Sequence, residues 1–172
     1  MFTTRPATAA DVPLLPAVER SAAEAFKRIP DLAWVADDDG QSEQRHLELI
    51  QGGVSWVAVN DASDAPLGFL NGQLMGGNLH IWEMSVGKDH QGKGIGRGLM
   101  NHARRWATSQ DLLAITLTTF RDVPWNDKFY ASMGFTMLSS SELTPALKRV
   151  LGDAVRDGFP GEKRCAMRLL LR

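Results

Sequence analysis

The sequence predicts one globular domain of mixed α/β architecture, in which strands and helices follow one another along 172 residues. Three observations support this fold class. The chain has 44% hydrophobic and 23% charged residues, which is the composition of a single domain with a buried core. Segments with strand character and segments with a helical apolar stripe succeed one another. No internal repeat, low-complexity segment or long linker divides residues 1–172.

The first half of the chain contains two helical patterns and four strand patterns. Thr8 or Asp11 is placed to cap the first helix. Residues 27–41 mix proline, glycine and aspartate, which indicates a surface loop with one apolar anchor. In order, the expected elements are a strand at 2–5, a helix at 14–26, the loop at 27–41, a helix at 46–51 and antiparallel strands at 54–59, 67–75 and 79–86.

The second half alternates helices and strands. Pro124 suits the first turn of a helix that Gly134 ends. Thr144 and Pro145 form a cap and first turn for a later helix, which Gly158 follows. In order, the expected elements are a helix over 95–106, a strand at 112–120, a helix at 124–133, a strand at 135–138, a helix over 145–157 and a strand at 164–171.

Charge and cysteine content exclude several functional classes. The formal net charge of -1 gives no overall attraction to nucleic acid or to an anionic membrane, so any phosphate recognition must be local. Cys165 is the one cysteine and the four histidines are scattered, which predicts neither a disulfide nor a metal site. No apolar run is long enough for a signal peptide or a membrane span. We therefore expect a cytoplasmic protein without nucleic-acid or membrane partners.

Four glycines occupy every second position from Gly92 to Gly98, between the strand at 79–86 and an amphipathic helix. Such spacing lets several backbone N–H groups converge on one anion, and the positive end of the helix dipole adds to the attraction. Lys93 and Arg97 lie alongside, although each alone could be an ordinary surface charge. The pattern predicts a phosphate-binding turn rather than a flexible connection.

Two well-known phosphate motifs do not fit this turn. A Walker A loop needs a Lys-Ser or Lys-Thr pair after its last glycine, and neither pair occurs here. The dinucleotide fingerprint G-x-G-x-x-G needs a third glycine where Arg97 or Leu99 stands. The bound group is therefore expected to be neither a simple nucleoside triphosphate nor a dinucleotide.

The pattern that fits the turn is Q-x-x-G-x-G, formed by Gln91, Gly94 and Gly96. It resembles the acetyl-CoA signature of the GNAT superfamily of N-acetyltransferases. In that family the amides of the turn hold the CoA pyrophosphate, and the backbone at the end of the preceding strand binds the pantetheine arm as an added strand. The resemblance therefore implies acetyl-CoA as the cosubstrate. The implied CoA-binding residues are Met84, Val86, Gln91, Gly92, Lys93, Gly94, Ile95, Gly96 and Arg97.

The resemblance also implies a fold for nearly the whole chain. Members of the family have a mixed, mostly antiparallel sheet of about seven strands flanked by helices, with two neighbouring strands splayed to admit CoA. Here the splayed strands are expected at 79–86 and 112–120. The resemblance is weakest at 27–41 and 139–162, where we expect the acceptor to be selected.

Tyr130 lies in the segment F-Y-x-x-x-G-F, from Phe129 to Phe135. Family members with this segment use the tyrosine hydroxyl to protonate the departing CoA thiolate, so the resemblance gives that role to Tyr130. A phenol with a pKa near 10 and a thiol with a pKa near 8.5 make the transfer reasonable. The alternative is a tyrosine packed in the core. An asparagine that often precedes the family's tyrosine by two turns is not matched, because Asn126 precedes Tyr130 by one turn.

The acceptor amine needs a base, because an ammonium with a pKa near 10.4 is neutral only about once in 2,500 molecules at pH 7. Glu83 leads, since it lies on the strand that lines the family's active site and can act directly or through a water. The strand at 112–120 carries no carboxylate. His80 and Asp122 are the alternatives, and strand alternation directs His80 and Glu83 to opposite faces.

These residues predict an acetyl-CoA-dependent N-acetyltransferase in which a primary amine of a small molecule or peptide attacks the thioester directly. The acidic run Asp37–Asp39 could attract a cationic amine, or it could be a solvated loop, and Trp34, Trp82 and Trp125 could line an acceptor pocket or pack in the core. Transfer of another acyl group, acetylation of a protein amine and a non-catalytic CoA sensor are alternatives. A homodimer is compatible with the sequence.

Overall fold

The computed structural model describes residues 1–172, which divide into two compact units. Unit 1 comprises Met1–Gln73 and Glu83–Ala103, and unit 2 comprises Leu74–Trp82 and Arg104–Arg172. Two strands and one helix continue along the chain from one unit into the other. One domain over residues 1–172 therefore stays a prediction.

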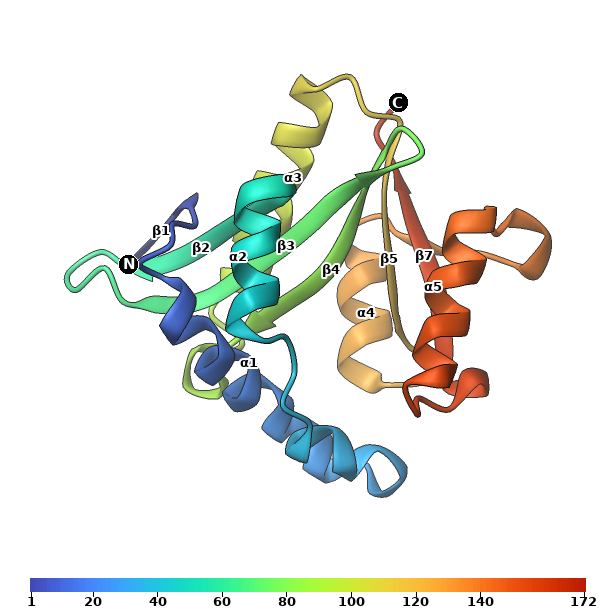
Figure 1. The fold of residues 1–172 in the computed structure, drawn as a ribbon, viewed down its shortest axis with the longest axis horizontal. Coiled ribbons are helices and arrows are strands. Elements are labelled where there is room, and N and C mark those ends of the chain that lie inside the picture. The colour runs from blue at the N-terminus through green and yellow to red at the C-terminus, as the bar shows by residue number, and fades with distance from the viewer. The chain divides into compact units, whose positions relative to one another are not determined.

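Seven strands form one mixed sheet flanked by helices, which confirms the predicted fold class (Figure 1). The strands are β1 (Phe2–Pro6), β2 (Val54–Asn60), β3 (Pro66–Met75), β4 (Asn78–Val86), β5 (Ala114–Phe120), β6 (Thr136–Met137) and β7 (Arg164–Leu170). Their order in the sheet is β1-β2-β3-β4-β5-β7-β6, and β4 and β5 are parallel. Every strand expected from the sequence is present, although β6 has two residues rather than four.

The α-helices also lie where the sequence predicts helices. The α-helices are α1 (Leu15–Ala23), α2 (Glu43–Gly52), α3 (Ile95–Ser109), α4 (Pro124–Ser132) and α5 (Pro145–Arg156). Short 3-10 helices are η1 (Val12–Leu14), η2 (Glu24–Arg28), η3 (Pro30–Asp37), η4 (Lys88–His90), η5 (Ser140–Glu142) and η6 (Gly161–Lys163). None of these helices has the length and apolar character that a membrane span needs.

In unit 1, the antiparallel strands β1, β2 and β3 carry helices on both faces. Val57 and Phe69 pack with Leu15 of α1 in a buried cluster. Trp56 points to the opposite face, because successive strand residues alternate, and its ring contacts His102 of α3 at 5.3 Å between centroids. The first face is thus covered by the N-terminal helices and the second by α3.

In unit 2, β5 is paired on both sides. Parallel pairs join Leu79–Ile81 of β4 to Ile115–Leu117 of β5, and β7 pairs with β5 in antiparallel fashion over its whole length. Leu138, Leu147 and Ala166 form a buried cluster beside α5. As predicted, Thr144 caps α5, since its hydroxyl accepts a hydrogen bond from the Leu147 amide at 3.2 Å.

The capping predicted for the first helix is wrong. Helical structure begins with η1, and the side chain of its N-cap residue Asp11 makes no capping hydrogen bond. Asp11 instead pairs with Arg5 at 2.9 Å and accepts the amide of Thr8 at 2.8 Å. Burial would raise the pKa of Asp11, but the hydrogen bonds from Arg5 and Thr8 outweigh it and lower that pKa. The carboxylate thereby ties β1 to the turn that follows it.

The irregular loop predicted at 27–41 is also wrong in part, because η3 covers most of it. Pro30 fits the first position of that helix, where its missing N–H costs nothing. The single apolar anchor is present, but it is Leu32, which is 2% exposed, whereas Trp34 is 39% exposed. The composition of residues 27–41 predicts an exposed segment, but it does not predict the 3-10 helix that the segment forms.

Candidate functional site

The glycine-rich segment forms a turn between β4 and α3 in unit 1. Gly92 and Gly94 have φ angles of +73° and +82°, which other residues adopt with strain, and nothing lies within 4 Å of an added Cβ at either position. The Gly94 carbonyl accepts the amide of Gly98 at 2.9 Å and so begins the helical ladder. Since the first N–H groups of an α-helix lack an acceptor within the helix, this start favours a bound anion.

Two side chains brace the turn by bonding to backbone. The amide of the Gln91 side chain donates to the Val86 carbonyl at 2.9 Å, which joins the turn to the end of β4. The Lys93 ammonium donates to the Asp89 carbonyl at 2.8 Å. The Q-x-x-G-x-G spacing thus has a local structural reason: the glutamine closes the loop, and the glycines allow its curvature.

The donor groups of this turn suit a phosphorylated cosubstrate. A helix start supplies backbone N–H groups, and the exposed side chains of Lys93 and Arg97 add positive charge. Ile95 is 3% exposed and anchors the first turn of α3 in the core. Met84 and Val86, the two predicted pantetheine-binding residues, are half-buried at the end of β4. Their role toward CoA stays a prediction.

Glu83 points to the face of β4 opposite Met84 and Val86. One of its carboxylate oxygens accepts a hydrogen bond from the Ser85 hydroxyl at 2.8 Å, and Ser85 is 5% exposed. Glu83 itself is half-buried. A carboxylate held by a neighbouring hydroxyl and still partly open to solvent can accept a proton, as the predicted base must.

The two alternative bases are less suited to that role. His80 in unit 2 is fully buried, its Nδ1 lies 2.9 Å from the Thr116 hydroxyl, and its ring packs on Trp82. Burial lowers the pKa of His80 to about 4, so the ring binds a proton weakly at pH 7. Asp122 is exposed, with a φ of +57°, in the connection from β5 to α4.

Tyr130 lies on α4 in unit 2 and is half-buried. Its ring packs edge-on against Phe129 and Phe135, with centroids 5.2 and 5.6 Å apart. The two phenylalanines that hold the Tyr130 ring thus belong to the same F-Y-x-x-x-G-F segment as Tyr130. Asn126 donates from its side chain to the Thr119 hydroxyl at 2.9 Å, so it joins α4 to β5.

Glu19 on α1 is a candidate functional residue that none of the sequence motifs contains. Its side chain is 13% exposed, and its pKa is raised to about 8, first by burial and then by the charge of Glu83. The sequence does place Glu19 on the apolar stripe of the helix, because it lies four residues after Leu15 and three before Ala22. A carboxylate at a core position of a helix is therefore a sign of a polar site, although no motif contains it.

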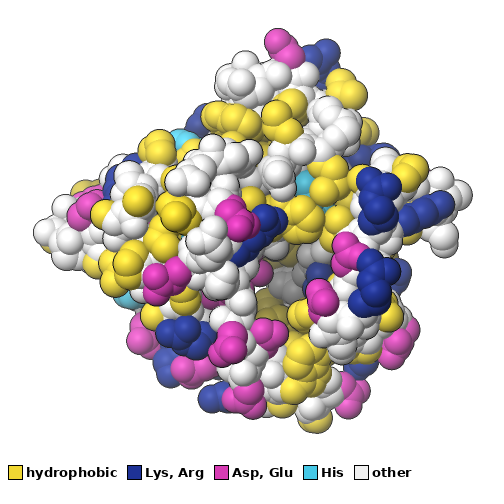
Figure 2. All heavy atoms as spheres, in the orientation of Figure 1, with side chains coloured by type: hydrophobic (Ala, Val, Ile, Leu, Met, Phe, Trp, Pro, Cys, Tyr) yellow, Lys and Arg dark blue, Asp and Glu magenta, His cyan; other side chains and the backbone are white.

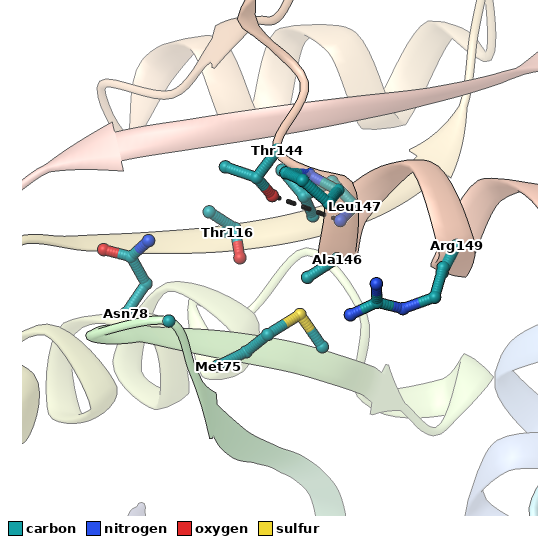
Figure 3. Close-up of a pocket in the computed structure, with 9 residues that line it drawn as sticks. Met75, Asn78, Thr116, Thr144, Ala146, Leu147 and Arg149 are labelled. Atoms are coloured by element: carbon teal, nitrogen blue, oxygen red, sulfur yellow. Dashed lines mark hydrogen bonds between the residues drawn. The ribbon is translucent and has the colours of Figure 1, made fainter.

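A separate pocket of about 380 Å³ lies in unit 2, and none of the predicted site residues lines it (Figure 3). Met75 at the end of β3 and Asn78 at the start of β4 face Thr144 and Arg149 of the α5 region. The Asn78 side-chain oxygen is buried without a hydrogen-bond partner.

Taken together, the mixed sheet with one parallel pair and a turn that suits an anion at a helix start are features of α/β proteins suited to a phosphorylated cosubstrate. The particular family follows from sequence. The profile of the Acetyltransferase (GNAT) family matches residues 17–135, so the chain belongs to that family.

Solved structures share the fold at low sequence identity. The PaiA N-acetyltransferase of Thermoplasma acidophilum, in complex with coenzyme A, is 15% identical with a TM-score of 0.73, and the match covers 99% of both chains. A ribosomal-protein-alanine N-acetyltransferase from Escherichia coli is 18% identical with a TM-score of 0.70 and covers 99% of this chain and 94% of its own.

A third structure, N-acetylglutamate synthase from Neisseria gonorrhoeae with coenzyme A and N-acetyl-glutamate, is 15% identical with a TM-score of 0.72. All of this chain matches 35% of that enzyme. Two of the three neighbours were thus crystallised with coenzyme A, which agrees with acetyl-CoA as the cosubstrate of this family member.

Proposed function

We propose that this protein transfers an acetyl group from acetyl-CoA to the nitrogen of a primary amine. The observation that carries the proposal is the Gln91–Arg97 turn, with two positive-φ glycines at a helix start, in a chain that belongs to the GNAT family. The turn binds the pyrophosphate through its amides, and the backbone at Met84 and Val86 binds the pantetheine arm.

The reaction forms one bond and breaks one. The neutral amine nitrogen attacks the acetyl carbonyl carbon, the carbon–sulfur bond breaks, and the thiolate leaves. Glu83 accepts the proton that the ammonium must lose, a loss that costs about 4.6 kcal/mol at pH 7 for an amine with a pKa near 10.4. The acetylated nitrogen releases its second proton to solvent as the amide forms, while Tyr130 gives its phenolic proton to the thiolate and recovers one from solvent.

Direct attack is favoured over a route through an acyl-cysteine. Cys165 is the single cysteine, and it is 1% exposed on β7. Burial raises the pKa of its thiol, so little of the reactive thiolate exists at neutral pH. A buried thiol of this kind behaves as a small core side chain, and the reducing cytosol where we expect the protein would keep it free.

The proposal is tested by mixing the protein with acetyl-CoA and a panel of amines, peptides and amino-sugar antibiotics while free thiol is measured. Succinyl-CoA in place of acetyl-CoA tests the choice of donor. We expect amine-dependent thiol release with acetyl-CoA and a product heavier by one acetyl group. If no amine is acetylated and calorimetry detects no binding of acetyl-CoA, the proposal is wrong.

A further inference from the structure

The carboxyl group of Glu19 is enclosed by backbone and side chains of unit 1. One of its oxygens accepts the backbone amide of Gln41 at 3.0 Å and lies 3.9 Å from Nε2 of His46 on α2. Gly40 packs so closely that an added Cβ would meet the Glu19 carboxyl at 2.5 Å. The segment before α2 is therefore shaped around this carboxyl group.

His46 is a buried polar side chain without hydrogen bonds beside that carboxyl group. Its side chain is fully buried, neither ring nitrogen has a hydrogen-bond partner, and the ring packs edge-on against Phe69. Burial lowers the pKa of His46, so the ring is neutral at pH 7 and does not compensate a charge on Glu19. A buried polar group in this state indicates a place where a polar ligand or water completes the site.

The second carboxylate comes from β4. Burial is the first cause of the raised pKa of Glu19 and the charge of Glu83 is the second, so the two carboxyl groups act on each other. The hydrogen bond from the Gln41 amide lowers this pKa; the charge of Asp38, which follows η3, raises it, and the charge of Arg20 lowers it by less. Figure 2 shows acidic and basic side chains side by side in the lower part of the view. We call Glu19, Gln41, His46 and Glu83 the Glu19 cluster.

We propose that the Glu19 cluster is the acceptor subsite and that it selects a primary amine whose molecule carries a second cationic group. The inference rests on the proposed function and specifies its substrate class. Glu83 receives the amine that reacts, and Glu19 binds the second cation.

Two charges are needed because the reacting amine loses its own. Once Glu83 has taken the proton, a monoamine keeps no positive charge to hold it in the site. A second ammonium or guanidinium group stays charged and pairs with Glu19 in surroundings of low polarity, where charge pairs are stronger than in water. Without a cation the cluster retains a proton on Glu19, and a dicationic acceptor displaces that proton.

The test compares acceptors that match in length and differ in charge. Putrescine and n-pentylamine have the same number of heavy atoms, and each is assayed with acetyl-CoA by thiol release. For the wild type we expect kcat/KM for putrescine to exceed that for n-pentylamine at least about tenfold, which is one pKa unit of charge interaction. In Glu19→Gln the ratio should fall to within about threefold of one, as partial loss of such an interaction predicts.

A matched control is Glu48→Gln, the same chemical change at an exposed position of α2, which should keep the wild-type ratio. Equal kcat/KM for the two amines in the wild type overturns the inference and leaves the proposed function standing, and this result needs no variant to fold. An unchanged ratio in a folded Glu19→Gln protein overturns it as well. Turnover of neither amine, nor of any other in the panel, overturns the proposed function and the inference with it.

Discussion

The glycine-rich turn and the Glu19 cluster both lie in unit 1, and they treat charge in opposite ways. The turn is exposed and leads into a helix start, where the first backbone N–H groups lack acceptors within the helix, so it suits an anion. The cluster is buried and brings carboxyl groups from α1 and β4, so ionising both is unfavourable and Glu19 keeps a proton until a cation binds. In the proposed function, local backbone geometry recognises the donor, whereas side chains that tertiary structure assembles recognise the acceptor.

The largest effect is expected from Glu83→Gln, which removes the proposed base from the cluster and leaves the turn intact. We predict a fall in kcat/KM for the amine of about 100- to 1,000-fold, within the range that a positioned base contributes. The acetyl-CoA dissociation constant, measured by calorimetry, should change less than about twofold, because no contact of the turn is altered. A fall smaller than about threefold would assign the base to another residue.

Tyr130→Phe tests a residue outside both regions and should have a smaller effect. A thiolate with a pKa near 8.5 can leave unprotonated, so we expect kcat to fall about 10- to 100-fold rather than vanish. The KM for both substrates should stay within about twofold of the wild type, because the phenol acts on the departing thiolate. Unchanged kcat would show that Tyr130 serves its packing with Phe129 and Phe135 instead.

The pH dependence of stability separates the cluster from ordinary surface carboxylates. The pKa of Glu19 is raised from 4.5 to about 8 in the folded protein, so between these values the unfolded chain releases a proton that the folded chain keeps. The free energy of unfolding therefore falls as pH rises from about 4.5 to about 8. Below about pH 4.5, Glu19 makes no difference to it. We expect the Tm of the wild type to fall by several degrees more than the Tm of Glu19→Gln over this pH range. In a chain of this size, each kcal/mol of lost stability lowers the Tm by about 2 to 4 °C.

Thermal unfolding in buffers from about pH 5 to pH 8 measures that difference. Glu48→Gln is the control, and its curve should run parallel to the wild type because its carboxylate is exposed. Parallel curves for the wild type and Glu19→Gln would mean that Glu19 is ionised in the folded protein.

Features that depend on residues close together in sequence could be predicted. They are the glycine-rich turn, the seven strands and the F-Y-x-x-x-G-F segment that contains Tyr130. Gln91 reaches Val86 five residues away, and glycine tolerates the φ that the turn requires. Glu19 and Glu83 are 64 positions apart, and their mutual influence exists only after α1 packs on the sheet. The same holds for Asp11, which looked like a helix cap but is bound by Arg5 and Thr8.

The loop predicted at 27–41 is wrong in part for a related reason. Its composition is that of a loop, and its 3-10 turns are stabilised by burial of Leu32, which local propensity does not register. The roles that could not be predicted from the sequence are therefore those of side chains whose partners are distant along the chain.

The most direct test measures donor and acceptor binding in two variants of unit 1, Gly94→Ala in the turn and Glu19→Gln in the cluster. Calorimetry gives the acetyl-CoA dissociation constant, and thiol release gives KM for putrescine. Because alanine strains the φ of +82° at Gly94, we predict that Gly94→Ala weakens acetyl-CoA binding about tenfold and changes the putrescine KM less than about twofold. Glu19→Gln should raise the putrescine KM about tenfold and change the acetyl-CoA dissociation constant less than about twofold. Equal shifts of both constants in either variant, or no acetyl-CoA binding by the wild type, would contradict the account.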